Sequence, residues 1–155
     1  MQSVTPFSSL RDEQERMTSL LALIKQEQLH LVAAEIDAIT EITARKTVLV
    51  GQLSQLAAQR HQALAAAGFA AAEEGMEGWL AQAGNPEAAA LWAELLGTTR
   101  EAKEQNRLNS LLVNKHMLHT QGALNAVRPP AQSGNFYGPS GQATSNTVSR
   151  RVVIG

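Results

Sequence analysis

The most constraining feature of this sequence is a long run without proline or glycine, which extends from Phe7 to Val50. Apolar residues recur within it in a heptad-like seam: Leu10, Met17, Ile24 and Leu31. A repeat near 3.5 residues predicts a helix that buries one stripe against a neighbouring helix. The chain is therefore expected to begin with long helices that pack side by side.

The apolar seam shifts position between Ala34 and Asp37, where Asp37 could cap a new helix. We expect a kink or a short break there. The first helix is expected to start after Ser8 and Ser9, because small polar caps precede acids that complement the helix dipole. A second apolar set marks one face of the next helix: Ile36, Ile39, Ile42, Leu49, Leu53, Leu56 and Leu64.

A glycine-rich stretch, residues 65–84, separates these helices from the last one. It predicts a connector that ends the second helix at Gly68 and contains at most a short helix around 76–83, with Phe69, Met76 and Trp79 closing one end of the core. Asn85 and Pro86 have the types preferred at the N-cap and first position of a helix. Gly97 is a position where this last helix could bend, and Pro129 with Pro130 should stop it.

The pattern predicts an all-α fold, an elongated antiparallel and coiled-coil-like arrangement of three long helices. The helical domain is assigned to residues 1–128. Residues 129–155 are rich in Gly, Ser, Pro, Asn and Thr and lack helical periodicity, so they are assigned as a flexible tail.

The last helix carries two apolar stripes on nearly opposite sides. One stripe should face the protein's own core: Leu91, Leu95, Ala102, Val113, Met117, Thr120, Leu124 and Val127. The other is formed by Leu108, Leu111, Leu112 and Leu118. It continues upstream through charged residues, Glu94, Glu101 and Glu104, which belong in water. Either another helix of the same chain or a second copy covers these leucines, or they form a docking surface for a partner's helix.

Composition and motifs exclude several classes of function. The sequence has no cysteine, which fits a reducing compartment. Its net charge of −1 and pI near 6.4 give no long-range attraction for nucleic acid. No leader peptide or membrane span is expected, so the localisation is predicted as cytoplasmic. Phosphate-binding loops and nucleophile elbows are missing from the sequence, and we expect no catalysis, no cofactor and no enzyme.

Two histidine patterns were weighed as metal sites and rejected. Glu27-x-x-His30 has the spacing of one half of a di-iron site, but no second copy exists. His116 and His119 share a helix face without a neighbouring carboxylate. We interpret them as surface or partner-facing residues and predict no metal site.

An adjacent aromatic pair, Phe136 and Tyr137, stands out in the polar tail, and Tyr137 is the only tyrosine in the chain. The pair could fold back onto the end of the helices. Alternatively, it could form a short linear motif in which glycines on either side let the backbone turn and present the ring to a partner.

The region 106–142 resembles the FlgN family of flagellar export chaperones. The resemblance rests on an Asn-x-x-Asn step (Asn106, Asn109), a Leu-Leu pair, a Gln-x-Ala-Leu turn (121–124) and then Tyr137-Gly138-x-x-Gly141. It implies a cytosolic, all-helical protein without catalytic activity. It also implies that the protein binds hook-associated proteins of the hook–filament junction before secretion and hands them to the export apparatus.

The resulting hypothesis is a chaperone that binds its client stoichiometrically. An amphipathic client segment would dock on Leu108, Leu111, Leu112 and Leu118 and be kept from premature polymerisation. The resemblance implies that the tail contributes to contacts with partners. Tyr137 is therefore the candidate contact with the export machinery, and Gly138 and Gly141 are candidate partner-binding residues beside it. The alternative is a structural coiled-coil subunit without a client, whose second stripe is its own oligomer interface.

Overall fold

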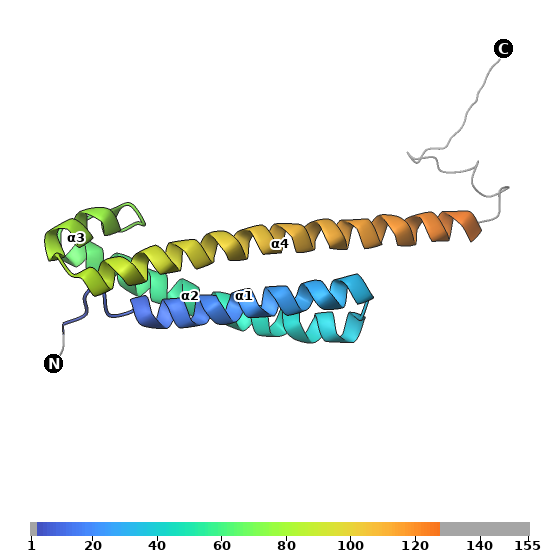
Figure 1. The fold of residues 1–155 in the computed structure, drawn as a ribbon, viewed down its shortest axis with the longest axis horizontal. Helices are drawn as coiled ribbons and strands as arrows, with labels where there is room; N and C mark the ends of the chain where they lie inside the picture. Colours follow the sequence, from blue (N-terminus) through green and yellow to red (C-terminus); the bar gives the residue numbers. More distant parts are fainter. Residues whose placement is uncertain (1–2, 128–155) are drawn as a thin grey trace, which may run out of the picture. The chain divides into compact units, whose positions relative to one another are not determined.

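The computed structural model describes residues 3–127, and every regular element in this range is a helix. The helices are α1 (Leu10–Ala33), α2 (Ile36–Ala66), α3 (Gly75–Ala83) and α4 (Pro86–Val127) (Figure 1). The all-α prediction is confirmed for this range. The chain divides into two compact units, Met1–Val113 and Asn114–Gly155, and α4 is common to both. The predicted division into 1–128 and 129–155 stays a prediction.

The break expected near Ala34 is present. Ala34 has φ 57° and ψ 40°, a left-handed conformation that ends α1, and the Glu35 N–H donates to the His30 carbonyl at 3.0 Å. The helix direction then reverses, and α2 begins at Ile36. Asp37 lies within the first turn of α2 rather than capping it.

α1 and α2 pack as an antiparallel pair in a single register (Figure 1). Glu13 of α1 pairs with Arg60 of α2, and Glu27 pairs with Lys46 with an Nζ–Oε1 distance of 2.9 Å. Leu20 of α1 packs near Leu53 of α2 between these two ion pairs. Each step moves seven residues forward on α1 and seven back on α2, as the heptad pattern requires.

Within the unit Met1–Val113, α4 runs parallel to α1 and antiparallel to α2. Ion pairs join Arg11 to Glu87 at 3.1 Å and Lys25 to Glu101 at 2.9 Å. Few Cα atoms of α4 lie within 8 Å of α1 or α2. Side-chain contacts therefore join α4 to the α1/α2 pair, and its backbone approaches these helices less closely than they approach each other.

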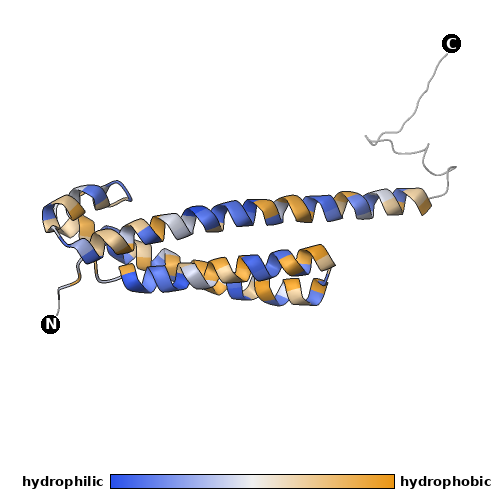
Figure 2. Ribbon diagram, in the orientation of Figure 1, coloured by the Kyte–Doolittle hydropathy of each residue, from blue (hydrophilic) through white to orange (hydrophobic). Residues whose placement is uncertain are grey.

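The core of this unit consists of two clusters. The first contains Leu10, Leu64, Met76, Ala88, Trp92 and Leu95. Met76 of α3 is fully buried there, with Phe69 and Trp79 packed against the cluster, so α3 closes one end of the core as expected. The second cluster contains Leu20, Ile24 and Ala102, with Leu49 and Leu53 partly buried against it. Figure 2 shows the resulting alternation of apolar and polar residues along each helix.

The start of α4 matches the sequence prediction. The Asn85 side-chain oxygen accepts hydrogen bonds from the backbone N–H groups of Glu87 at 3.0 Å and Ala88 at 3.3 Å, and Pro86 is the first helical residue. The helix then continues through Gly97 to Val127 without interruption. Pro129 and Pro130 lie outside the described residues.

Candidate partner-binding surfaces

The buried face of α4 is shorter than the sequence pattern predicted. Its buried residues are Ala88, Trp92, Leu95, Ala102 and Asn109. Val113, Met117, Leu124 and Val127 were expected in the core but are exposed, as is Thr120, so this part of the prediction is wrong. In the unit Met1–Val113, α1 ends less than two turns after Glu27, the partner of Asn109. The apolar pattern of α4 therefore continues beyond the residues that α1 can contact.

The four leucines proposed as a docking stripe differ in exposure. Leu111 is 52% exposed and Leu118 is 74% exposed, whereas Leu108 and Leu112 are partly buried. The acidic residues upstream on this side face solvent as expected, and Glu104 forms a 2.8 Å ion pair with Arg107. The hydrogen bond from Arg107 holds the pKa of the Glu104 carboxyl below its usual range. The leucines' role in partner binding stays a prediction.

Asn109 is a buried residue of α4 that forms hydrogen bonds to α1. Its Nδ2 donates to the Ile24 carbonyl and to Glu27 Oε1, both at 2.8 Å. Lys46 of α2 donates to the same Glu27 oxygen and to Asn106 Oδ1 at 3.1 Å. Asn106 and Asn109, noted in the sequence only as a motif step, therefore belong to a polar network that joins three helices. The seven-residue spacing from Ala102 already placed Asn109 on the buried face.

Arg60 is the centre of a second buried network, which the sequence interpretation missed. Arg60 and Glu13 are each 3% exposed, and the guanidinium makes two hydrogen bonds to the Glu13 carboxylate, at 2.9 and 3.1 Å. Arg60 also donates twice to Glu73, and Ser9 donates to Glu13 at 2.8 Å. Buried charges of this kind are tolerated only when their hydrogen bonds are satisfied.

The ion pairs of this network shift the pKa of its members. Burial alone would raise the pKa of the Glu73 carboxyl, but hydrogen bonds and charge from Arg60, and then from His61, outweigh burial and lower it. Burial would likewise lower the pKa of Arg60, and the two carboxylates raise it instead. Both groups are therefore charged at neutral pH.

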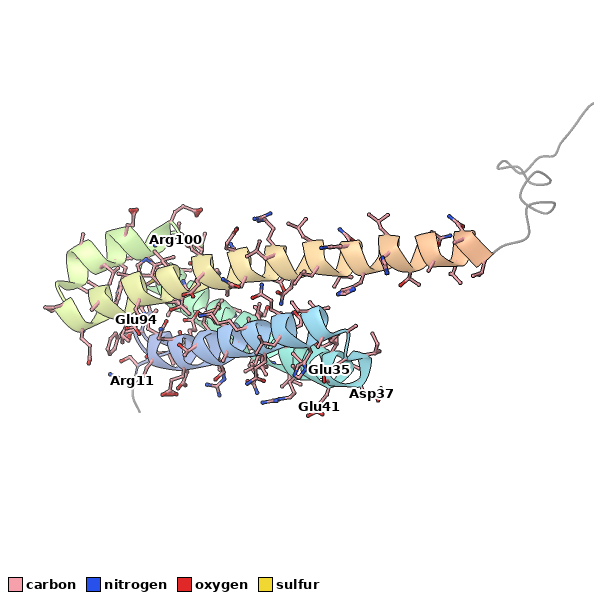
Figure 3. All side chains as sticks on the ribbon, turned by 45° about the vertical axis from the view of Figure 1, so that its right-hand side comes forward. Arg11, Glu35, Asp37, Glu41, Glu94 and Arg100 are labelled. Carbon is pink, nitrogen blue, oxygen red and sulfur yellow. The ribbon has the colours of Figure 1, made fainter. Side chains whose placement is uncertain are left out.

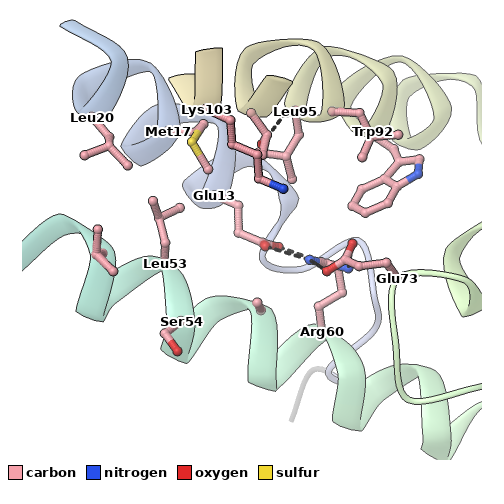
Figure 4. Close-up of a pocket in the computed structure, with 14 residues that line it drawn as sticks. Glu13, Met17, Leu20, Leu53, Ser54, Arg60, Glu73, Trp92, Leu95 and Lys103 are labelled. Atoms are coloured by element: carbon pink, nitrogen blue, oxygen red, sulfur yellow. Dashed lines mark hydrogen bonds and ion pairs between the residues drawn. The ribbon is translucent and has the colours of Figure 1, made fainter. Parts of the chain in front are cut away.

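A groove lies beside this network, between α2 and α4, with α1 as its floor. Its cavity has a volume of about 470 Å³. Figure 4 shows Leu53 of α2 on one side, Leu95 and Trp92 of α4 on the other, and the Glu13–Arg60 pair at one end. The lining is mainly apolar: Met17, Leu20, Val50, Leu53, Ala57, Trp92, Leu95 and Leu96. Sequence reasoning did not find this groove.

The turn between α1 and α2 carries a different surface. Figure 3 shows Glu35, Asp37 and Glu41 around this turn. The apolar residues Leu29, Val32 and Ile36 are exposed in the same region. Nothing in the chain covers them within the described range.

No group of three potential metal ligands occurs within residues 3–127. The Glu27 carboxylate is bound by Lys46 and Asn109, and His30 contacts Glu35 instead, with an Nδ1–Oε1 distance of 2.8 Å. The predicted partner-binding residues of the tail, Tyr137, Gly138 and Gly141, lie outside the described residues.

The family model described as "FlgN protein" matches residues 1–145, nearly the whole chain. The chain belongs to the FlgN family. FlgN is the flagellar export chaperone family, so the resemblance identified from region 106–142 is confirmed and extends to the N-terminal helices.

The FlgN assignment supports a chaperone role in flagellar assembly in general. No match was found among curated proteins or among solved structures. Within residues 3–127, no helix combines the length and hydrophobicity that crossing a membrane requires.

Proposed function

We propose that this FlgN-family chain binds hook-associated proteins in the cytoplasm, prevents their premature polymerisation and delivers them to the flagellar type III export apparatus. The chain acts by stoichiometric binding and not as an enzyme. The family match over residues 1–145 supports the chaperone class. The choice of hook-associated proteins as clients comes from what the resemblance implies.

The observation that carries client binding is the exposure of large apolar side chains on α4. Leu111 and Leu118 are more than half exposed, although each would stabilise a buried interface by about 1.5 to 3 kcal/mol. An amphipathic client segment that packs on these leucines would remove them from water. Leu108 and Leu112 are partly buried and would flank the contact.

Delivery is assigned to the tail. Tyr137 would contact the export apparatus, and Gly138 and Gly141 would allow the local turn that presents its ring. A segment outside α4 leaves the helix free to hold the client while the tail binds a second partner. Client binding and delivery should then be separable by mutation.

A calorimetric titration with a hook-associated protein tests client docking. Leu111→Asp with Leu118→Asp should weaken binding about a hundredfold or more, because two apolar contacts are lost and two charges enter the interface. Ser110→Asp with Thr120→Asp, which adds equal charge at exposed polar positions on the other side of α4, is the matched control. Wild-type affinity in a folded double-leucine variant would place the docking face elsewhere.

Self-association of the leucine face is the competing function, a structural coiled-coil subunit without a client. Exposed apolar residues on α4 are equally suited to a second copy of the chain. Light scattering of the purified protein separates the two functions. A stable high-order oligomer that the double-leucine change dissociates would favour the structural subunit.

A further inference from the structure

We infer that the groove between α2 and α4 is a second docking site for the client, which takes an amphipathic helix of about three turns that carries a carboxylate for Lys103. This inference rests on the proposed function, because the occupant is part of the same client. It concerns the unit Met1–Val113 alone. The leucine face of α4 is a separate surface.

The walls of the groove are as long as a short helix. On α4 it extends from Trp92 to Lys103, and on α2 from Val50 to Arg60. At 1.5 Å per residue each wall is about 15 to 17 Å long, or roughly three helical turns. The backbone of α4 stays further from α1 and α2 than these two helices are from each other, and the cavity between them can receive side chains of another helix.

Apolar side chains remain exposed at the mouth of the groove. Val50 on α2 is 52% exposed and Leu96 on α4 is 36% exposed, and both line the cavity. Behind them, Met17 and Leu20 of α1 form an apolar floor. A helix with one apolar face would bury both rims and the floor together, as in other helix-in-groove complexes.

One charged side chain of the groove is left for a partner. The carboxylates of Glu13 and Glu73 are already paired with Arg60, and His61 also contacts Glu73. Lys103 of α4 lines the same cavity and forms no ion pair among the described residues. The docked helix should therefore carry a carboxylate that pairs with Lys103.

Charges introduced at the two rims provide the first test. Val50→Glu with Leu96→Glu should weaken binding of a hook-associated protein about tenfold or more in a calorimetric titration. The matched control is Val48→Glu with Ala93→Glu, which adds one charge to each exposed helix surface outside the groove. Lys103→Glu should also weaken binding, whereas Arg100→Glu, exposed on the same helix outside the groove, should not.

A photoreactive residue in place of Ser54, which lines the groove, provides a second test that does not depend on the rim variants. It should crosslink to one helical segment of the client. Wild-type affinity in the folded rim variant, or no crosslink to a client that is bound, would overturn the inference. If the rim variant binds normally and the double-leucine variant does not, only the groove is wrong. If the wild-type chain binds no client, the proposed function itself fails.

Discussion

The guanidinium carbon of Arg60 lies 4.7 Å from the centroid of the Trp92 ring. This stacking connects α2 to α4 at the point where Arg60 also holds the Glu13 carboxylate of α1. One cation thus contacts all three long helices. The contact explains why a charged side chain occupies a position that the heptad pattern would give to an apolar one.

Replacing Arg60 should strongly destabilise the fold. Arg60→Leu leaves the Glu13 carboxylate buried without its cation, which costs about 3 to 5 kcal/mol. Arg11→Leu breaks an exposed pair with Glu87 and should cost about 1 kcal/mol or less. Urea unfolding followed by circular dichroism measures both. Equal, small effects would mean that the buried pair contributes no more than the exposed one.

Acidification should selectively remove the contribution of Glu73. Its folded-state pKa is below the ordinary value of 4.5, so its ion pairs stabilise the fold fully above that pH and are lost as the pH falls through the lower folded pKa. The stability difference between wild type and Glu73→Gln should therefore be constant near neutral pH and shrink below about 4.5. The effect should be modest because the side chain is half exposed. A difference that grows on acidification would contradict this assignment.

The same substitution should destabilise the protein at Leu95 and leave its stability nearly unchanged at Leu111. Leu95→Asp places a charge in the first core cluster, which costs several kcal/mol against a total stability of about 5 to 15 kcal/mol. Leu111→Asp places the charge on an exposed face and should leave thermal melting nearly unchanged. Similar melting temperatures for the two variants would show that the buried face of α4 has been misplaced.

Ala34→Gly should stabilise the protein. Ala34 adopts a left-handed conformation that costs an L-residue about 1 to 2 kcal/mol. Glycine removes this strain but loses more entropy on folding, so the expected net gain is about 0.5 to 1 kcal/mol. Ala22→Gly, in the middle of α1, should instead destabilise by about 1 kcal/mol. Denaturant midpoints of the two variants should shift in opposite directions.

Tyr137→Ala should separate delivery from client binding. Affinity for a hook-associated protein should be unchanged, whereas secretion of that protein should fall. Phe136→Ala is the neighbouring control, because it removes an aromatic ring outside the proposed Tyr-Gly contact. A loss of client affinity in Tyr137→Ala would move this residue into the client site.

The helices could be predicted from sequence because their signals are local. The Asn85–Pro86 start, the break after Ala33 and the short helix before Gly84 depend on residues within a few positions of each boundary. The length of the buried face could not be predicted this way. It depends on where α1 ends relative to α4, and the periodicity of α4 does not contain that information.

The two buried networks were missed for a related reason. Glu13 and Glu27 lie three residues after Leu10 and Ile24, at the second seam position of the heptad. Polar residues at such positions are normally assigned to solvent. Their carboxylates can be buried only when a facing helix supplies a cation at the same level. The apolar pattern of one helix does not show how it pairs with another.

The register of α1 and α2 should also prevent the proposed client from displacing either helix. A client helix with a purely apolar heptad could replace α1 only by leaving the buried Arg60 and the partly buried Lys46 without their carboxylates. It could replace α2 only by leaving Glu13 and Glu27 without cations. The charged layers therefore make helix exchange unfavourable. A chaperone with such charged layers could bind the apolar helices of a client at its surface without exchanging its own helices for them.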